Sequence, residues 1–344
     1  MRRAVAAATL ALALGPLLVA CSGDEPSADP ARERTGQSRA PKQPGGTGAG
    51  STTATGQASP TGAPTPSAEQ PSAPPLTQRF VPAETARELA RRLTTAEDLV
   101  RDRSTTGDLL EAAAFETQLL YRQLARTPAW VPLVRDLVPG RYRADVAAHV
   151  LARRSLRSVI TTLSDELPSW RIVEPAPVGR LLSFYREGER EYGVPWEVLA
   201  AINLVETGFG KIDGLSSAGA QGPMQFIPST WAAYGEGDVN DPHDAILAAA
   251  RYLDARGGSG GPEQLRQALY AYNNHGGYVD GILAYASVLQ RDPDALRGLH
   301  RWQIIYLSTI GDIWLPVGYR ESEPVPVRRY VEQHPERRLG TTTS

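Results

Sequence analysis

A glutamate at the end of a predicted apolar helix is the residue best suited to acid chemistry. Pro195 predicts a helix start, and Gly208 predicts the helix end. Glu206 follows Ile202 by four residues and Leu199 by seven, so helical periodicity places all three side chains on one face. Desolvation and the negative end of the helix dipole both disfavour the ionised carboxylate, which favours proton donation near neutral pH. On spacing alone, a solvated charge at a helix end is the commoner explanation.

Four short motifs occur in sequence order from this acid onward. They are Glu-Thr at 206–207, Ser-Ser-Ala-Gly-Ala-Gln-Gly-Pro-Met-Gln-Phe at 216–226, Ile-Pro-Ser-Thr-Trp at 227–231 and Ala-Tyr-Asn at 271–273. From about residue 194 to residue 286 the chain resembles the soluble and membrane-bound lytic transglycosylases, relatives of goose-type lysozyme. The resemblance implies a lysozyme-like helical catalytic domain, with Glu206 at the position of the family's catalytic acid.

Neutral polar side chains in these motifs are suited to binding a glycan. Ser216, Gln225 and Asn273 supply donors and acceptors that match sugar hydroxyl and acetamido groups. Gly222, like Gly219, permits a tight turn and the close approach of backbone to a ligand. These residues are therefore expected to line the substrate site.

Two apolar residues and a tyrosine complete the expected substrate site. Met224 and Phe226 offer apolar surface to sugar rings, although core packing explains Phe226 almost as well. Tyr272 shares a predicted helix face with Leu269, so we expect its ring to pack while its hydroxyl reaches toward Glu206.

The chain departs from the family pattern at three positions. Thr207 replaces the usual serine and keeps a hydroxyl, and Pro223 replaces a leucine. His275 stands where the family usually has glycine, and Gly276 follows one place late. These differences do not change the expected fold. They leave open which branch of the family the chain resembles and which substrates it prefers.

The resemblance implies that Glu206 acts alone as general acid and base on the bond between N-acetylmuramic acid and N-acetylglucosamine, leaving a 1,6-anhydromuramyl end. A hydrolytic muramidase is the first alternative, and it needs a second carboxylate about 5 Å or more from the donor. Asp213, Glu236, Asp238 and Asp244 are candidates by proximity in the sequence. A non-catalytic peptidoglycan-binding scaffold lipoprotein is the second alternative.

The amino-terminal residues predict export and anchoring. Residues 1–20 combine a positive start with an apolar run that ends in small residues, which is typical of a signal peptide. The sequence Leu-Val-Ala-Cys at 18–21 resembles the lipobox of bacterial lipoproteins, so Cys21 is the predicted lipidation site. Residues 21–78 are rich in Pro, Gly, Ser, Thr and Ala, which predicts a disordered linker. We expect a lipid-anchored protein at the cell membrane that faces the cell wall.

The remaining sequence predicts a mainly α fold, because apolar residues recur at helical spacing. We expect a helical region at 79–172, the catalytic domain at 173–298 and a C-terminal extension at 299–344. Within the extension, the segments 302–306 and 313–317 predict a small β-hairpin.

One helix of the first region is unusually basic. A solvated face is the simpler explanation, and contact with an anionic polymer or a membrane is the alternative. Its arginines are Arg141, Arg143, Arg153, Arg154 and Arg157.

Composition and motifs exclude several other classes of protein. The chain has 36 basic and 38 acidic residues, so it lacks the basic excess of a nucleic-acid-binding protein. A single cysteine and five histidines without zinc-binding spacing predict no metal site, and no cofactor fingerprint is present. The Gly-Gly-Ser-Gly-Gly stretch at 257–261 follows a predicted helix rather than a strand, which argues against a hydrolase nucleophile. The expected partners are peptidoglycan glycan strands and, through Cys21, the membrane.

Overall fold

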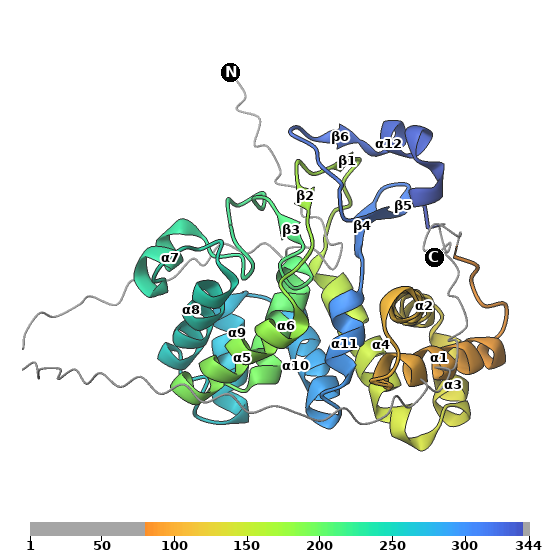
Figure 1. Cartoon of the computed structure of the whole chain (residues 1–344), viewed down its shortest axis with the longest axis horizontal. Helices are drawn as coiled ribbons and strands as arrows, with labels where there is room; N and C mark the ends of the chain where they lie inside the picture. The colour runs from red at the N-terminus through yellow and green to blue at the C-terminus, as the bar shows by residue number, and fades with distance from the viewer. Residues whose placement is uncertain (1–79, 340–344) are drawn as a thin grey trace, which may run out of the picture. The chain divides into compact units, whose positions relative to one another are not determined.

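The computed structural model describes residues 80–339. The predicted signal peptide, Cys21 and the linker at 21–78 lie outside the described residues. Helices dominate the described part and the strands form short antiparallel pairs (Figure 1), so the mainly α prediction is confirmed. Within residues 80–339, no helix combines the length and the apolar character needed to cross a membrane.

The first region is built from short and medium-length helices. In chain order they are α1 (Ala86–Arg101), α2 (Gly107–Arg126), η1 (Pro128–Trp130), α3 (Val131–Leu137), η2 (Gly140–Tyr142) and α4 (Arg143–Val159). Thr85 begins α1, where its hydroxyl accepts a hydrogen bond from the Glu88 N–H at 3.1 Å.

The next region contains the helices that carry the sequence motifs. They are α5 (Val178–Tyr192), α6 (Trp196–Thr207), α7 (Pro228–Tyr234), α8 (Pro242–Ala255), α9 (Pro262–Tyr272), α10 (Gly276–Arg291) and α11 (Ala295–Arg301). Gly208 ends α6 in the left-handed conformation, with φ of 61°. The Asp241 carboxylate accepts hydrogen bonds from the first turn of α8. Local capping signals therefore set these helix ends where the sequence predicts them.

The strands pair across long sequence separations. The pairs are β1 (Glu166–Leu167) with β6 (Val325–Pro326), β2 (Arg171–Ile172) with β3 (Ile212–Asp213), and β4 (Ile304–Ser308) with β5 (Gly311–Leu315). The β4–β5 pair is the hairpin expected from the sequence, but each strand lies two residues closer to the turn than predicted, and the turn falls at residues 309–310. Helices α12 (Val327–Gln333) and η3 (Pro335–Arg337) follow β6. The C-terminal extension thus packs back onto residues 167–172 and Ile212, with which it forms a separate apolar cluster.

One continuous apolar core joins the first region to the motif-bearing helices. In Figure 1, α10 and α11 lie between α1–α4 and α5–α9. Helix α4 approaches α10 so closely that a Cβ at Gly281 would lie 2.5 Å from Leu156 Cγ. The N-terminal helices therefore support α10 directly.

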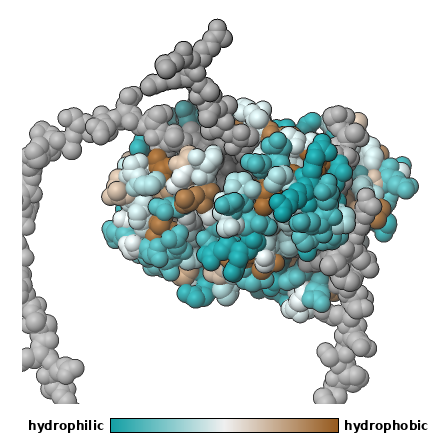
Figure 2. All heavy atoms as spheres, turned by 90° about the horizontal axis from the view of Figure 1, so that it is seen from above, coloured by the Kyte–Doolittle hydropathy of each residue, from teal (hydrophilic) through white to brown (hydrophobic). Residues whose placement is uncertain are grey.

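The face of the molecule in Figure 2 is largely hydrophilic, with apolar residues scattered singly over it. Scattered apolar residues of this kind are normal on a protein surface.

Candidate active site

Glu206 lies in the last turn of α6 and is 2% exposed. Its Oε1 accepts a hydrogen bond from the Tyr278 hydroxyl at 2.8 Å, whereas Oε2 is buried and has no hydrogen-bond partner within the described residues. Burial raises the pKa of Glu206 to about 8, and the hydrogen bond from Tyr278 opposes that rise. The carboxyl group therefore holds its proton at neutral pH.

Tyr278 is a site residue that the sequence analysis missed. It lies in the first turns of α10 and is fully buried, with its hydroxyl on Glu206. The start of α10 is capped by His275, whose Nδ1 accepts a hydrogen bond from the Gly277 N–H at 2.9 Å. The departure from the family pattern at His275 therefore has a structural role, because it begins the helix that carries Tyr278. The signal available in the sequence was a tyrosine near the start of a predicted helix.

Tyr278→Phe is expected to raise the pKa of Glu206. The hydrogen bond from Tyr278 favours the ionised carboxylate, and the substitution removes this bond. Tyr285→Phe is the matched control: Tyr285 is also buried on α10, and its hydroxyl has no hydrogen-bond partner within the described residues. Titration of the Glu206 carboxyl by ¹³C NMR measures both effects. Equal pKa values in the two variants would contradict the assigned role of Tyr278.

Tyr272 connects α9 to the loop that follows β3. Its hydroxyl donates to the Met224 carbonyl at 2.6 Å, so its recorded hydrogen bond differs from the expected reach toward Glu206. Its ring stacks on that of Tyr278 at 6.3 Å and meets Phe226 at 6.2 Å. Tyr272 therefore joins the loop to the helix that holds the acid in place.

The loop at 216–226 is fastened to α6 by buried polar side chains. The Thr207 hydroxyl donates to the Pro223 carbonyl at 2.7 Å and accepts from the Gly210 N–H at 2.9 Å. Asn203 Nδ2 donates to the same Pro223 carbonyl at 2.9 Å. The hydroxyl of Thr207, the residue after Glu206, thus holds the loop at 216–226 against α6.

Thr207→Val is expected to lower the free energy of unfolding by about 1–3 kcal/mol, because it removes the hydrogen bonds of a buried hydroxyl to the Pro223 carbonyl and from the partly buried Gly210 N–H. Thr207→Ser keeps the hydroxyl and is expected to cost less. Urea unfolding compares the two variants. If the serine variant lost as much stability as the valine variant, the hydroxyl would not be the fastening group.

Two residues of this loop adopt left-handed backbone conformations. Gly222 has φ of 74°, and a Cβ there would lie 1.9 Å from the Val239 carbonyl oxygen, so the position requires glycine. Gln225 has φ of 52°, an uncommon value for a residue with a side chain, and such strain clusters at functional sites.

Three of the predicted site residues hold buried oxygen atoms without hydrogen-bond partners in residues 80–339. These atoms are Oε2 of Glu206, Oε1 of Gln225 and Oδ1 of Asn273. Buried polar atoms are nearly always hydrogen-bonded in folded proteins, so each unpaired atom calls for an explanation, such as an ordered water or a catalytic role. The motifs on α6, on the loop at 216–226 and at the end of α9 thus each contain one buried oxygen atom without a hydrogen-bond partner in residues 80–339.

Comparison with known families agrees with this geometry. The family profile described as "Transglycosylase SLT domain" matches residues 183–290. This segment belongs to the transglycosylase SLT domain family. A curated relative, "Membrane-bound lytic murein transglycosylase F" from Maricaulis maris (strain MCS10), is 34% identical to the chain over 105 residues. The match covers 29% of this chain and 23% of the relative, so the chain spans less than a quarter of the relative's length. No solved structure gives a significant match.

The SLT domain runs from α5 to α10 and contains every substrate residue expected from the sequence. Some of these residues have structural contacts instead of open faces. Ser216 Oγ accepts a hydrogen bond from the Ala220 N–H at 2.7 Å, which closes the turn between them. Met224 and Phe226 are 0% and 3% exposed, so the thioether of Met224 and the ring of Phe226 pack in the core.

The carboxylates considered as second catalytic groups of the SLT domain have other contacts. Asp213 pairs with an arginine on β2, and Glu236 pairs with Arg251 at 3.1 Å. Asp238 accepts from a neighbouring backbone N–H, and Asp244 accepts from the Asp238 N–H at 2.9 Å. Within residues 80–339, no carboxylate is found in hydrogen-bond contact with Glu206, whose one recorded partner is Tyr278.

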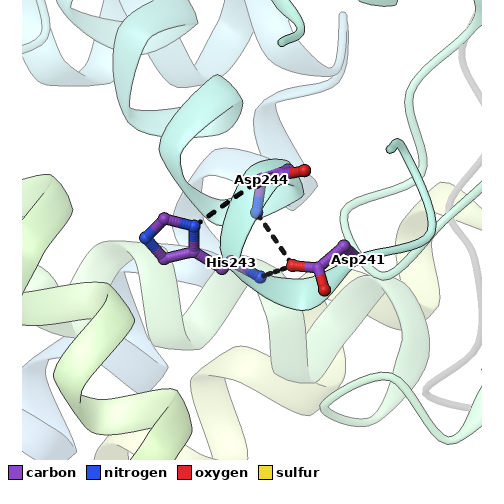
Figure 3. A group of neighbouring side chains, drawn as sticks. All are labelled: Asp241, His243 and Asp244. Atoms are coloured by element: carbon purple, nitrogen blue, oxygen red, sulfur yellow. Dashed lines mark hydrogen bonds and ion pairs between the residues drawn. The ribbon is translucent and has the colours of Figure 1, made fainter. Parts of the chain in front are cut away.

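One cluster at the start of α8 has the composition of a metal site. Asp241, His243 and Asp244 lie close together in Figure 3. Asp241 Oδ1 accepts from the N–H groups of His243 and Asp244, and His243 Nδ1 lies 3.3 Å from Asp244 Oδ1. Since these atoms already cap α8 and bond one another, the cluster is explained as a helix start.

Proposed function

We propose that this protein is a peptidoglycan lytic transglycosylase in which Glu206 is the single general acid and base. The observation that carries the proposal is a buried carboxyl group, neutral near pH 7, with Tyr278 as its recorded hydrogen-bond partner. A general acid works best when its pKa lies near the operating pH. Membership of the SLT domain family and the name of the curated relative support the same activity.

The proposed reaction needs two proton transfers, and the Glu206 carboxyl group performs both. Glu206 donates its proton to the glycosidic oxygen as the bond from that oxygen to the muramyl anomeric carbon breaks. The resulting carboxylate then takes the proton of the muramyl 6-hydroxyl, whose oxygen forms the new bond to the anomeric carbon. Glu206 is neutral again at the end, and no water is consumed.

Substrate binding would use the side-chain oxygens of Gln225 and Asn273, which lack hydrogen-bond partners within residues 80–339. The Gln225 and Asn273 side-chain oxygens are acceptors, so they suit the hydroxyl and acetamido N–H groups of the amino sugars. The Gln225 side-chain N–H donates to the Gly222 carbonyl at 3.0 Å, which holds the side chain against the loop.

The proposal extends to where the enzyme acts. A signal peptide at 1–20, lipidation at Cys21 and a linker at 21–78 would tether the catalytic part to the membrane. The name of the curated relative describes it as membrane-bound, which supports the same arrangement. Export to the cell wall follows from the substrate.

The decisive experiment incubates the full chain with purified peptidoglycan and weighs the released muropeptides. The proposal predicts anhydro ends, lighter by one water than hydrolysed ends. Reducing ends would instead support the hydrolytic muramidase. Binding without release would support the scaffold lipoprotein, and either result would overturn the proposal.

The rate of cleavage is expected to fall as the pH rises through about 8, because the acid must be protonated. Below that pH, Glu206 is neutral and the rate stays high until another group titrates. Initial rates of muropeptide release from about pH 4 to about pH 10 test this. A decline that began near pH 4.5, the ordinary value for a glutamate, would contradict the buried-acid mechanism.

A further inference from the structure

A second concave site lies outside the residues assigned to catalysis. It is a cavity of about 420 Å³ bounded by α2, α4 and β4. Its lining includes five arginines: Arg122, Arg126, Arg153, Arg154 and Arg157. Three of these belong to the basic helix that the sequence analysis left as either a solvated face or an anionic contact. The volume lies within the range of small-ligand sites.

The positive charge of this arginine cavity is only partly balanced. Asp312 Oδ2 and Oδ1 pair with Arg122 and Arg126, each at 2.7 Å. Arg153, Arg154 and Arg157 form no ion pair within residues 80–339. Five guanidinium groups therefore share a single paired carboxylate, and the cavity is suited to an anion.

Arg153 is the most constrained of the five. It is 8% exposed, its Nη2 donates to the Gln118 carbonyl at 3.1 Å, and its guanidinium lies 4.8 Å from the Trp302 ring centroid. Its Nε is buried and has no acceptor among the described residues. Burial lowers the pKa of Arg153 to about 10, which still leaves it charged at neutral pH. An unpaired buried donor on a held arginine is a feature that a bound acceptor would satisfy.

The remaining lining residues indicate the kind of anion. Ala125, Leu156 and Leu307 give the arginine cavity apolar walls beside its guanidinium groups. Guanidinium forks match carboxylate and phosphate oxygens alike. Apolar walls favour an anion that carries aliphatic groups, as a short peptide with carboxylates does, over a polyol phosphate chain.

The arginine cavity adjoins the helix that holds the catalytic acid. Its lining residue Leu156 packs against Gly281, and a Cβ at Gly277 would lie 2.6 Å from the Oγ of its lining residue Ser158. Both glycines lie on α10, beside Tyr278. The arginine cavity is therefore built on the helix that packs against α10, and α10 in turn carries the hydrogen-bond partner of Glu206.

We propose that the arginine cavity binds the carboxylates of a stem peptide carried by the glycan strand. This inference rests on the proposed function, since it assigns the peptide to the same substrate. Arg153 and Arg154 would bind the peptide carboxylates, while Leu156 and Leu307 would contact its aliphatic groups.

Isothermal titration of the full chain with a purified stem tetrapeptide bearing free carboxylates tests the assignment. We expect binding, and at least a tenfold weaker affinity for the same peptide with its carboxylates amidated. Arg154→Gln is expected to weaken binding at least tenfold. Arg154 is exposed, so its substitution removes only a positive charge from the cavity. Arg135→Gln, an exposed arginine on α3 outside the cavity, is the matched control and should bind like the native protein.

The proposal is overturned if the native protein does not bind the peptide, if amidation has no effect, or if both arginine variants behave alike. Binding of a glycerol phosphate oligomer in place of the peptide would also overturn it. Cleavage of peptide-free glycan strands is measured separately on the same proteins. Retained cleavage without peptide binding refutes only the arginine cavity, and peptide binding without cleavage refutes only the proposed function.

Discussion

Glu206→Gln is expected to reduce the release of anhydromuropeptides by about 1,000-fold or more, because the variant has no proton to donate or recover. General acid and base catalysis contributes on the order of 100- to 10,000-fold, and here one group performs both transfers. Glutamine has nearly the same shape and keeps an oxygen for the Tyr278 hydroxyl. Quantifying released muropeptides by mass spectrometry measures the loss. Turnover at the native rate would refute the role of Glu206.

The same variant is expected to be at least as stable as the native protein at neutral pH. The pKa of Glu206 is raised on folding, so its contribution to stability is full below about 4.5 and is lost as the pH rises through about 8. Glutamine does not titrate, so the melting temperature of the variant should gain on that of the native protein across this range. A variant that unfolded more readily at pH 8 than at pH 5, relative to the native protein, would contradict the burial of a neutral acid.

Gly222→Ala is expected to give the largest loss of stability, about 3 kcal/mol or more, together with a loss of glycan cleavage of about 100-fold. A Cβ at this position would lie 1.9 Å from the Val239 carbonyl oxygen, so the loop must move. A displacement of about 1 Å in groups that position a substrate costs on the order of 100-fold in rate. Gln225 follows on the same loop and would be displaced with it.

Gly219→Ala is the matched control for that substitution. Gly219 has a similar φ of 77°, but nothing lies within 4 Å of a Cβ built there. Gly219→Ala should therefore cost only the left-handed strain, about 1–2 kcal/mol, and should reduce cleavage less than Gly222→Ala does. Urea unfolding and muropeptide release, both measured where the variants are folded, separate the two effects. Equal losses in the two variants would show that contact with Val239 is unimportant.

The helix ends and the acid could be predicted from the sequence because their signals are local. Asp241 before Pro242 and Gly208 after the apolar run act within a few residues of the ends that they set. The apolar face that includes Glu206 has the same origin, since it depends on helical periodicity alone. Burial of Glu206 therefore agrees with the sequence analysis.

Contacts between segments that are distant in the sequence could not be predicted from these local signals. Tyr278 reaches Glu206 across 72 residues, and its position depends on how α10 packs against α6 and α4. Tyr272 has the expected spacing on α9, but the packing of that helix directs its recorded hydrogen bond to the Met224 carbonyl. Periodicity identifies the buried face of each helix and leaves open which neighbour that face meets.

Residue type alone also overstated the open surface of the site. Ser216 and Met224 have the chemistry of sugar contacts, yet one closes a turn and the other is fully buried. Gln225 and Asn273 differ from them in holding oxygens with no hydrogen-bond partner within residues 80–339. The unpaired atoms, which only the folded arrangement reveals, separate the two groups.

The ionisation of Glu206 tests the central claim most directly. The full chain labelled with ¹³C at glutamate carboxyl groups would be titrated by NMR, with Glu206→Gln identifying the resonance. The account predicts a pKa of about 8 for this carboxyl in the folded protein. A value near 4.5, with the carboxylate already charged in mildly acidic buffer, would contradict it.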